Sequence, residues 1–301
     1  MKQLVILSGK GGTGKTSVAA ALAHLASKEI PIVLADADVD AANLELILDP
    51  TRLEEHLFES GLLAVIDQDR CSLCGRCAEV CRYDAVIREA AGTEDEAYRV
   101  DPLACEGCAS CVTQCPESAI HSEEQQAGLW FRSDTRFGPL FHAHLFAAQE
   151  NSGKLVTLVK QHGRLLALDE DRKVLIVDGP PGIGCPVISA CSGADLALLV
   201  VEPTVSGIHD LERVLGTVNH FGVPALVCIN KADLNPVHSA AIEAFCTSQG
   251  IDVVGKVPFD TVITEAMVAG LPVTVHQPDG AVSTELARVW QRVWQRLADS
   301  V

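Results

Sequence analysis

The glycine-rich segment "GKGGTGKT" (9–16) constrains the fold of this chain more than any other feature. It follows the apolar run "KQLVIL" (2–7) and opens a helical pattern over 15–28. A strand, a G-x-x-x-x-G-K-S/T loop and a helix form a phosphate-binding unit, in which backbone N–H groups at a helix N-terminus surround phosphate oxygens. The sequence therefore predicts an α/β fold with a nucleotide site at this loop.

Five further apolar runs have the composition of buried parallel strands. They are rich in Val, Ile and Leu and lack clean alternation, as expected of strands covered by helices on both faces. Helical patterns over 207–220, 236–249, 261–269 and 283–298 accompany them. This order predicts a doubly wound, mostly parallel sheet. The five runs are 30–36, 173–179, 194–203, 223–230 and 251–258.

The stretch between about 60 and 150 interrupts this alternation and contains an internal repeat. Residues 65–86 match residues 99–120 at a constant offset of 34, and the four cysteines of each copy coincide. A repeated strand, cysteine loop and helix is the plan of bacterial ferredoxins. We expect an inserted, small α+β ferredoxin-like domain with a β-hairpin extension. The expected parts are 1–59 and 151–301 for the host, 60–123 for the insertion, and a hairpin reaching about 150.

Each copy has the cysteine spacing C-x₂-C-x₂-C-x₃-C, which is a ligand pattern of iron–sulfur clusters. In this pattern the fourth cysteine ligates the cluster of the other copy. Zinc sites are the alternative, but they usually pair two C-x₂-C elements across a longer gap. One 4Fe–4S cluster is therefore assigned to Cys71, Cys74, Cys77 and Cys115. The second 4Fe–4S cluster is assigned to Cys81, Cys105, Cys108 and Cys111.

Lys10 makes the phosphate loop a two-lysine variant, K-G-G-x-G-K-S/T. With this loop the chain resembles the class of P-loop ATPases that includes MinD, Mrp, ParA and the nitrogenase iron protein. The resemblance implies an ATP-dependent homodimer, in which Lys10 reaches the partner's phosphates. From the loop itself, Lys15 is expected at the β- and γ-phosphates and Thr16 at Mg²⁺. The residues expected to contact the nucleotide here are Gly11, Gly12, Thr13, Gly14, Lys15, Thr16 and Ser17.

Two further segments resemble the hydrolytic part of the same class. In "LADADVDAANL" (34–44), the resemblance places Asp38 where it orients the attacking water and Asp36 near Mg²⁺. Asn43 would contribute from the start of the following helix. In "VDGPPG" (177–182), Asp178 would hold Mg²⁺ through water. A carboxylate beside the γ-phosphate is what activation of water requires.

Two segments near the carboxyl end resemble the base-binding part of the class. "NKAD" (230–233) ends a strand, and the resemblance places Asn230 on the adenine. "VPFD" (257–260) matches a loop that packs on the base, through Pro258. The implied activity is Mg²⁺-dependent hydrolysis of ATP to ADP, with Lys10, Lys15 and Asp38 as catalytic residues.

Charge and hydropathy disfavour several classes of partner. The net charge of −17, from 23 Lys and Arg against 40 Asp and Glu, disfavours nucleic acids and anionic membrane surfaces. The apolar run from Leu4 to Leu7 is too short for a signal-peptide core. No apolar run approaches the ~20 residues of a spanning helix. We expect a cytoplasmic protein with no nucleic-acid partner and no stable membrane insertion.

Several cysteines and histidines lie outside these motifs. Cys185 follows Asp178 by seven residues, in a region where the nitrogenase iron protein carries a cluster-ligating cysteine. Its alternatives are a metal-accepting thiol at a dimer interface and a small buried residue, and we favour the buried residue. His142 and His144 would face one way on a strand, and we favour packing over metal binding. Three cysteines on apolar positions are expected in the core: Cys191, Cys228 and Cys246.

The leading hypothesis is an ATP-driven conformational switch coupled to low-potential electron transfer or to metal-cofactor assembly on a partner protein. The insertion enters after the D-x-D segment and leaves before the strand of Asp178, so both junctions flank the nucleotide-sensing elements. A Mrp-type iron–sulfur cluster carrier is one alternative, weakened because the eight cysteines form closed sites. A MinD-like positioning ATPase with structural clusters is another, disfavoured by the acidic composition.

Overall fold

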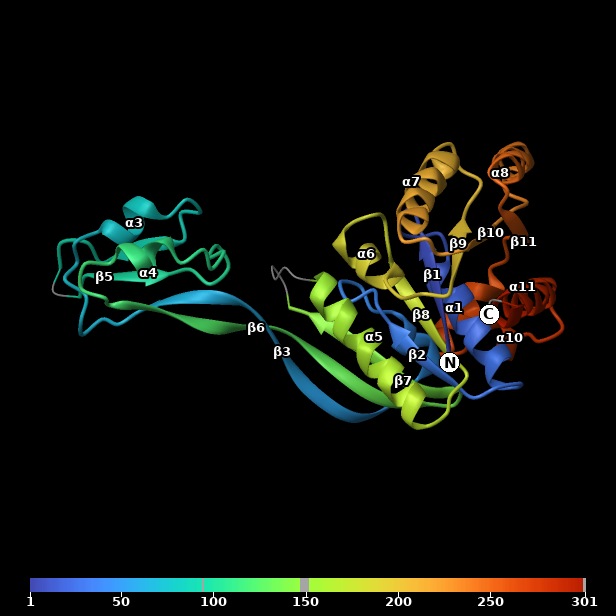
Figure 1. Ribbon diagram of the computed structural model, residues 1–301, viewed down its shortest axis with the longest axis horizontal. Helices are drawn as coiled ribbons and strands as arrows, with labels where there is room; N and C mark the ends of the chain where they lie inside the picture. The colour runs from blue at the N-terminus through green and yellow to red at the C-terminus, as the bar shows by residue number, and fades with distance from the viewer. Residues whose placement is uncertain (94, 147–151, 300–301) are drawn as a thin grey trace. The chain divides into compact units, whose positions relative to one another are not determined.

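The structure is a computed structural model that divides the chain into two compact units (Figure 1). Strands β3 (Thr51–Ile66) and β6 (Ile120–Thr135) each cross the boundary between the units. The first unit comprises Met1–His56, Trp130–His144 and the chain from Ser152 onward, and the second comprises Leu57–Leu129 with Leu145 and Phe146. The residues described are 1–93, 95–146 and 152–299.

These limits differ from the domain boundaries predicted from sequence. The second unit extends beyond 60–123 at both ends, because β3 and β6 begin and end outside the cysteine repeat. The predicted hairpin is present, formed by β6 and β7 (Gly138–Leu145) around a two-residue turn. However, β7 pairs in parallel with β2 (Ile32–Asp36), so this part of the hairpin belongs to the main sheet. The boundary expected at 150 and 151 lies outside the described residues.

The first unit is built on a sheet with the strand order β11-β10-β9-β1-β8-β2-β7-β6-β3. All recorded pairs among β1, β2 and β7 to β11 are parallel. The apolar runs are buried almost throughout, which confirms the predicted doubly wound parallel sheet. The remaining strands are β1 (Lys2–Ser8), β8 (Val174–Pro181), β9 (Leu196–Val201), β10 (Ala225–Asn230) and β11 (Asp252–Val257).

Alternate residues of the strands pack against helices on opposite faces of the sheet, so both faces are covered. Leu34 and Ile176 pack in one core with α1 (Lys15–Ser27) and α11 (Ala281–Asp299). Val33 and Leu175, the neighbours of these residues, lie against Gly163 of α5 (Ser152–Asp169). The other helices of the unit are α2 (Leu44–Leu48), α6 (Cys185–Cys191), α7 (Gly207–His220), α8 (Pro236–Ser248), α9 (Val262–Val268) and α10 (Val273–His276).

The second unit reproduces the internal repeat in three dimensions. Helices α3 (Arg76–Val80) and α4 (Ser110–Gln114) are separated by the same offset as the repeat, and an antiparallel pair joins β4 (Val86–Glu89) to β5 (Ala97–Val100). The two copies exchange equivalent hydrogen bonds. Asp67 N–H donates to Ala119 O at 2.8 Å, and Asp101 N–H donates to Ala85 O at 2.7 Å. The copies are therefore tied to each other by a reciprocal backbone contact.

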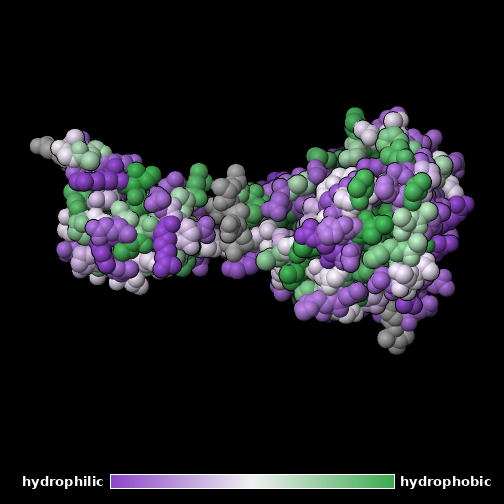
Figure 2. Space-filling model, turned by 90° about the horizontal axis from the view of Figure 1, so that it is seen from above, coloured by the Kyte–Doolittle hydropathy of each residue, from purple (hydrophilic) through white to green (hydrophobic). Residues whose placement is uncertain are grey.

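Among the described residues, no helix combines the length and the hydropathy that crossing a membrane requires. On the face seen in Figure 2, hydrophilic side chains are interspersed with apolar ones on both units. Isolated exposed apolar residues such as Val205 and Val268 are ordinary on protein surfaces.

His24 is a buried histidine of the first unit that faces no carboxylate in its recorded contacts. It lies in α1, with Nδ1 2.8 Å from Thr274 Oγ1 of α10. Burial, together with the positive charges of Lys28 and Arg136, lowers the pKa of His24 to about 4. The unfolded chain, with an ordinary histidine pKa of 6.5, therefore binds this proton at a higher pH than the folded chain does.

We expect the stability of the fold to fall as the pH is lowered through the range between these two pKa values. His24 alone should remove about 2 kcal/mol of unfolding free energy between pH 7.5 and pH 5. Urea denaturation at both pH values measures this loss. In His24→Gln the amide can still bond to Thr274 but cannot titrate, so its pH dependence should be smaller by that amount. Equal pH dependence in both proteins would contradict this role.

Candidate functional site

The phosphate loop connects β1 to α1 and requires glycine at two positions. Gly12 and Gly14 have φ angles of 78° and 87°, a region that side chains disfavour. A Cβ atom on Gly14 would also lie 2.2 Å from Asn230 Nδ2, so the close approach of these segments excludes any side chain. The other residues expected to contact the nucleotide lie in this loop and the first turn of α1: Gly11, Thr13, Lys15, Thr16 and Ser17.

Lys15 lies at the centre of a buried acidic cluster. Its Nζ is 2.8 Å from Asp178 Oδ1 and 3.6 Å from Asp38 Oδ2. Burial acts to lower the pKa of Lys15, but Asp178, Asp38 and Asp36 outweigh it and leave the pKa raised. Asp36 and Asp178 are register partners on β2 and β8, and burial followed by the charge of Asp178 raises the pKa of Asp36 to about 8. Parallel pairing thus gathers residues from distant segments beside one lysine.

The carboxylates of the cluster differ in how much hydrogen-bonding capacity they retain. Asp36 accepts the backbone N–H groups of Asp38 at 3.1 Å and Leu44 at 3.0 Å, so both of its oxygens are occupied. Asp178 Oδ2 is buried and has no hydrogen-bond partner among the described residues. An orphaned carboxylate oxygen beside a phosphate loop suits a hard cation such as Mg²⁺. Asp178 thus has an unpartnered carboxylate oxygen, whereas Asp36 holds the backbone of the segment that carries Asp38, and the binding of Mg²⁺ by either residue stays a prediction.

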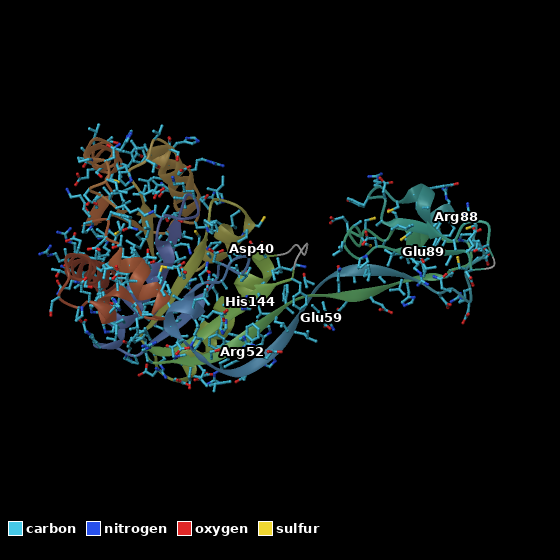
Figure 3. The ribbon with its side chains drawn as sticks, turned by 180° about the vertical axis from the view of Figure 1, so that it is seen from behind. Asp40, Arg52, Glu59, Arg88, Glu89 and His144 are labelled. Carbon is cyan, nitrogen blue, oxygen red and sulfur yellow. The ribbon has the colours of Figure 1, made fainter. Side chains whose placement is uncertain are left out.

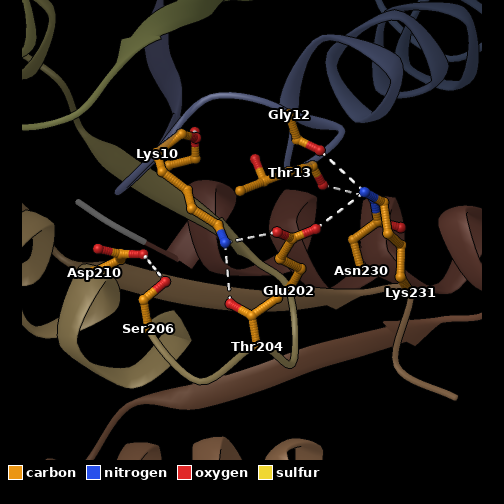
Figure 4. Close-up of polar contacts among 10 residues, drawn as sticks. Lys10, Gly12, Thr13, Glu202, Thr204, Ser206, Asp210, Asn230 and Lys231 are labelled. Atoms are coloured by element: carbon orange, nitrogen blue, oxygen red, sulfur yellow. Dashed lines mark hydrogen bonds and ion pairs between the residues drawn. The ribbon is translucent and has the colours of Figure 1, made fainter. Parts of the chain in front are cut away.

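Glu202, a residue that the sequence analysis missed, joins two lysines of the site (Figure 4). Its carboxylate lies 2.8 Å from Lys10 Nζ and 3.0 Å from Lys231 Nζ. Lys10 also donates to Thr204 Oγ1, and Lys231 donates to the carbonyl of Gly12. Lys10, which the family resemblance assigns to a partner's phosphates, is thus held within its own chain. Glu202 directly follows β9, at the carboxyl ends of the parallel strands, where such sheets place functional groups.

Of the two segments expected at the base, "NKAD" contacts the phosphate loop and the loop of Pro258 lies beside "NKAD". Asn230 is buried, and its Nδ2 donates to the carbonyl of Thr13 at 2.7 Å. Its Oδ1 has no hydrogen-bond partner among the described residues. Asp233 accepts the N–H of Phe259 at 2.6 Å, which fixes the loop of Pro258 beside the "NKAD" segment. Asn230 supports the phosphate loop in this structure, and its contact with adenine stays a prediction.

The eight motif cysteines line two pockets of the second unit. Each pocket takes three cysteines from one copy of the repeat and the fourth from the other copy, which are the sets predicted from spacing. Apolar side chains such as Ile66, Tyr98 and Ile120 complete one of them. The first pocket is lined by Cys71, Cys74, Cys77 and Cys115, and the second by Cys81, Cys105, Cys108 and Cys111. The ligand of these pockets stays a prediction.

The two chemistries considered for these cysteines need different spacings of the sulfur atoms. Four ligands of one zinc ion, each about 2.3 Å from the metal, lie about 3.8 Å apart in a tetrahedron. Among the described residues, the cysteines provide no set of three sulfur atoms within 4.8 Å of one another. In a 4Fe–4S cluster each thiolate binds a different iron, which sets the sulfur atoms farther apart. Which of the two the pockets hold stays a prediction.

Cys185 differs from its expected environment. The preference for a small buried residue is wrong, because Cys185 is exposed. It occupies the first position of α6, just after the glycine-rich turn that follows β8, where the start of a short helix leaves the side chain uncovered. The prediction of core cysteines is confirmed for Cys191, Cys228 and Cys246, all fully buried. Burial raises the pKa of Cys228 to about 12, so this thiol is inert.

Comparison with known proteins places this site in a family. The sequence model of the family described as the CobQ/CobB/MinD/ParA nucleotide binding domain matches residues 4–273. An uncharacterized protein of Methanocaldococcus jannaschii is 36% identical over 237 residues, which cover 78% of this chain and 80% of that protein. An uncharacterized ATP-binding protein of the same organism is 26% identical over 287 residues, covering 95% and 85%. The solved structure of the septum site-determining protein MinD with Mg-ADP from Pyrococcus horikoshii aligns with a TM-score of 0.60 and 18% identity, covering 97% of this chain and 95% of that one. The chain therefore belongs to the CobQ/CobB/MinD/ParA nucleotide-binding family and is a P-loop ATPase.

Proposed function

We propose that this ATPase carries two 4Fe–4S clusters and couples its nucleotide state to electron transfer, or to metal-cofactor assembly, on a partner protein. The observation that carries the proposal is the pair of four-cysteine pockets, each completed by a cysteine from the other copy of the repeat. Clusters held in this way supply one-electron transfer at low potential.

The cysteines divide into buried and exposed ligands in a way that suits exchange of electrons with a partner. Cys77 and Cys111 are buried in the core of the second unit, where they would fix each cluster to the fold. Cys74 and Cys108 are exposed. A cluster with one exposed ligand lies near the surface, where a partner can approach it. The closed arrangement of all eight cysteines favours retained clusters over a carrier that releases them.

The chain's own residues supply the parts that hydrolysis needs. Lys15 would bind the β- and γ-phosphates, and the unpartnered oxygen of Asp178 would be available to Mg²⁺. Asp38, partly exposed beside Lys15, would orient an attacking water. Mg²⁺, when bound, would neutralise charge that develops on the phosphates. Lys10 would act on a second copy of the chain after leaving Glu202, which makes an ATP-dependent homodimer part of the proposal.

The path of the chain offers a route for coupling the two functions. Asp36 holds the N–H of Leu44, the first residue of α2, and α2 leads directly into β3 and the second unit. The chain returns through β6 and β7, and β7 pairs with β2, the strand that ends at Asp36. Both connections therefore leave from elements that adjoin the acidic cluster around Lys15. A rearrangement beside Asp38 on hydrolysis would act on both strands.

Iron analysis of anaerobically purified protein tests whether the cysteine pockets hold clusters. We expect about eight irons and about eight acid-labile sulfides per chain, four of each per cluster, with broad visible absorption. The physical reason is that eight thiolates in two sets of four match two cubane clusters. Stoichiometric zinc in a colourless protein would reject the clusters while leaving the ATPase assignment intact.

A further inference from the structure

Three side chains outside the nucleotide site and the cysteine pockets converge in the first unit. Glu45 lies in the first turn of α2, while His142 and His144 lie two residues apart on β7 and so leave the same face of the strand. The two oxygens of Glu45 lie 3.0 Å from His142 Nδ1 and 3.2 Å from His144 Nε2. One ligand atom of each residue lies within 4.8 Å of the others. Figure 3 labels His144 on this part of the unit.

His142 is held as a ligating histidine would be. Its ring is buried, and its Nε2 lies 2.9 Å from the hydroxyl of Ser133, which is fully buried on β6. A hydrogen bond from the second ring nitrogen to an oxygen is the usual support of a metal-bound histidine. His142 Nδ1 has no hydrogen-bond partner among the described residues, although an oxygen of Glu45 is near. A buried polar atom without a partner destabilises the fold, and a ligand at this point would offset that cost.

We propose that Glu45, His142 and His144 bind a divalent transition-metal ion. Two imidazoles and one carboxylate suit Zn²⁺, Co²⁺ or Fe²⁺ and differ from the thiolate sets of the second unit. His142 is 1% exposed and closes one side of the site, whereas His144 is 39% exposed. An ion can therefore enter from the side of His144. Three protein ligands leave at least one position for water or another small ligand.

The charges around the site permit a cation. Arg52, labelled in Figure 3, pairs with Glu55 at 3.0 Å, and its guanidinium lies over the ring of Phe131. Its charge is therefore partly neutralised by a carboxylate of its own strand. The carboxylate of Glu45 is the anionic ligand that compensates the ion.

A bound ion would tie α2 to β7. Leu44, which precedes Glu45, donates its N–H to Asp36, so the ion would also steady the segment between Asp36 and α2 that carries Asp38. The ion site therefore lies only a few residues along the chain from the acidic cluster around Lys15. The ion is an addition to the proposed cluster function and does not depend on it.

Titration of the full-length protein as isolated with Co²⁺ tests the proposal by visible difference absorption, with the spectrum before addition subtracted. Nitrogen and oxygen ligands give d–d bands without the intense thiolate-to-cobalt charge transfer of cysteine sites. We expect one equivalent to bind in this way, and His144→Ala and Glu45→Gln to weaken binding by at least about 100-fold. Ser133→Ala should weaken binding by about 10–100-fold through loss of the supporting hydrogen bond. His121→Ala, which removes an exposed histidine of the second unit, is the matched control and should bind as the unchanged protein does.

Two outcomes would overturn the site. Equal affinity in the unchanged protein and in both His144→Ala and Glu45→Gln would show that the ion binds elsewhere. Thiolate charge-transfer bands that account for all of the bound cobalt would assign it to the cysteines. His144 and Glu45 are partly exposed, so their variants are expected to fold and the test does not rely on the buried His142.

Discussion

Replacing Cys115 with serine is expected to remove the cluster of the first copy of the repeat and to leave the cluster of the second. Iron should fall from about eight to about four per chain. Cys115 lies at the end of α4, within the second copy, but it lines the pocket of Cys71, Cys74 and Cys77. The loss of one thiolate leaves one iron of that cluster without its cysteine ligand. Iron and sulfide analysis, with electron paramagnetic resonance of the reduced protein, measures the loss.

The reciprocal variant tests the crossed arrangement, in which each cluster takes its fourth cysteine from the other copy of the repeat, against one in which all four cysteines come from the same copy. Cys81→Ser should destroy the cluster of Cys105, Cys108 and Cys111, because Cys81 lines their pocket. Combining Cys115→Ser with Cys71→Ser should cost no more iron than either change alone, since both act on one cluster. Cys185→Ser, which changes an exposed thiol outside the pockets, is the control and should keep all the iron. If Cys115→Ser combined with Cys111→Ser lost only one cluster, the crossed assignment would be wrong.

Lys15→Ala is expected to abolish detectable ATP hydrolysis, with a loss of at least about 100-fold in turnover. The Nζ of Lys15 is the cation between Asp178 and Asp38, and it is only 6% exposed. Without it, the phosphates would meet the carboxylates of Asp178 and Asp38 without the lysine that offsets their charge. Removing one partner of a buried ion pair also costs about 3–5 kcal/mol of stability. Turnover, ATP binding and thermal unfolding should therefore all be measured on this variant.

Asp38→Asn distinguishes the chemical step from binding. It keeps the shape of the side chain and should bind ATP, yet it should turn over about 100-fold more slowly if Asp38 orients the attacking water. Asp40→Asn is the matched control, because Asp40 is an exposed carboxylate of the same segment. Turnover in Asp38→Asn equal to that of the unchanged protein would refute the role given to Asp38.

The parallel sheet could be predicted from sequence because its strands are apolar almost without interruption and glycine marks the phosphate loop. The first part of the edge strand β3 could not, because Arg52, Glu54 and Glu55 interrupt any apolar run there. Helix α5 was missed although Leu155 and Val159 repeat at helical spacing, since its exposed face carries many polar residues.

The parts of the site that escaped prediction are those that depend on tertiary contacts. Glu202 carries no motif, and its role follows from the two lysines that β1 and β10 bring to it. Glu45 meets His142 only because β7 enters the sheet beside β2. The cysteine sets, by contrast, were assigned from spacing alone. A repeated motif fixes its own pairing, whereas single polar residues acquire partners only through the fold.

Redox titration of the clusters in each nucleotide state tests the proposed coupling most directly. Potentials are measured with ATP held by Asp38→Asn, with ADP and without nucleotide, and partner binding can be followed in the same states. The account predicts that at least one potential differs between the ATP and ADP states by about 59 mV or more, which corresponds to about 1.4 kcal/mol for one electron. Identical potentials in all three states, together with unchanged partner binding, would contradict the coupling and leave an ATPase whose clusters act independently of the nucleotide.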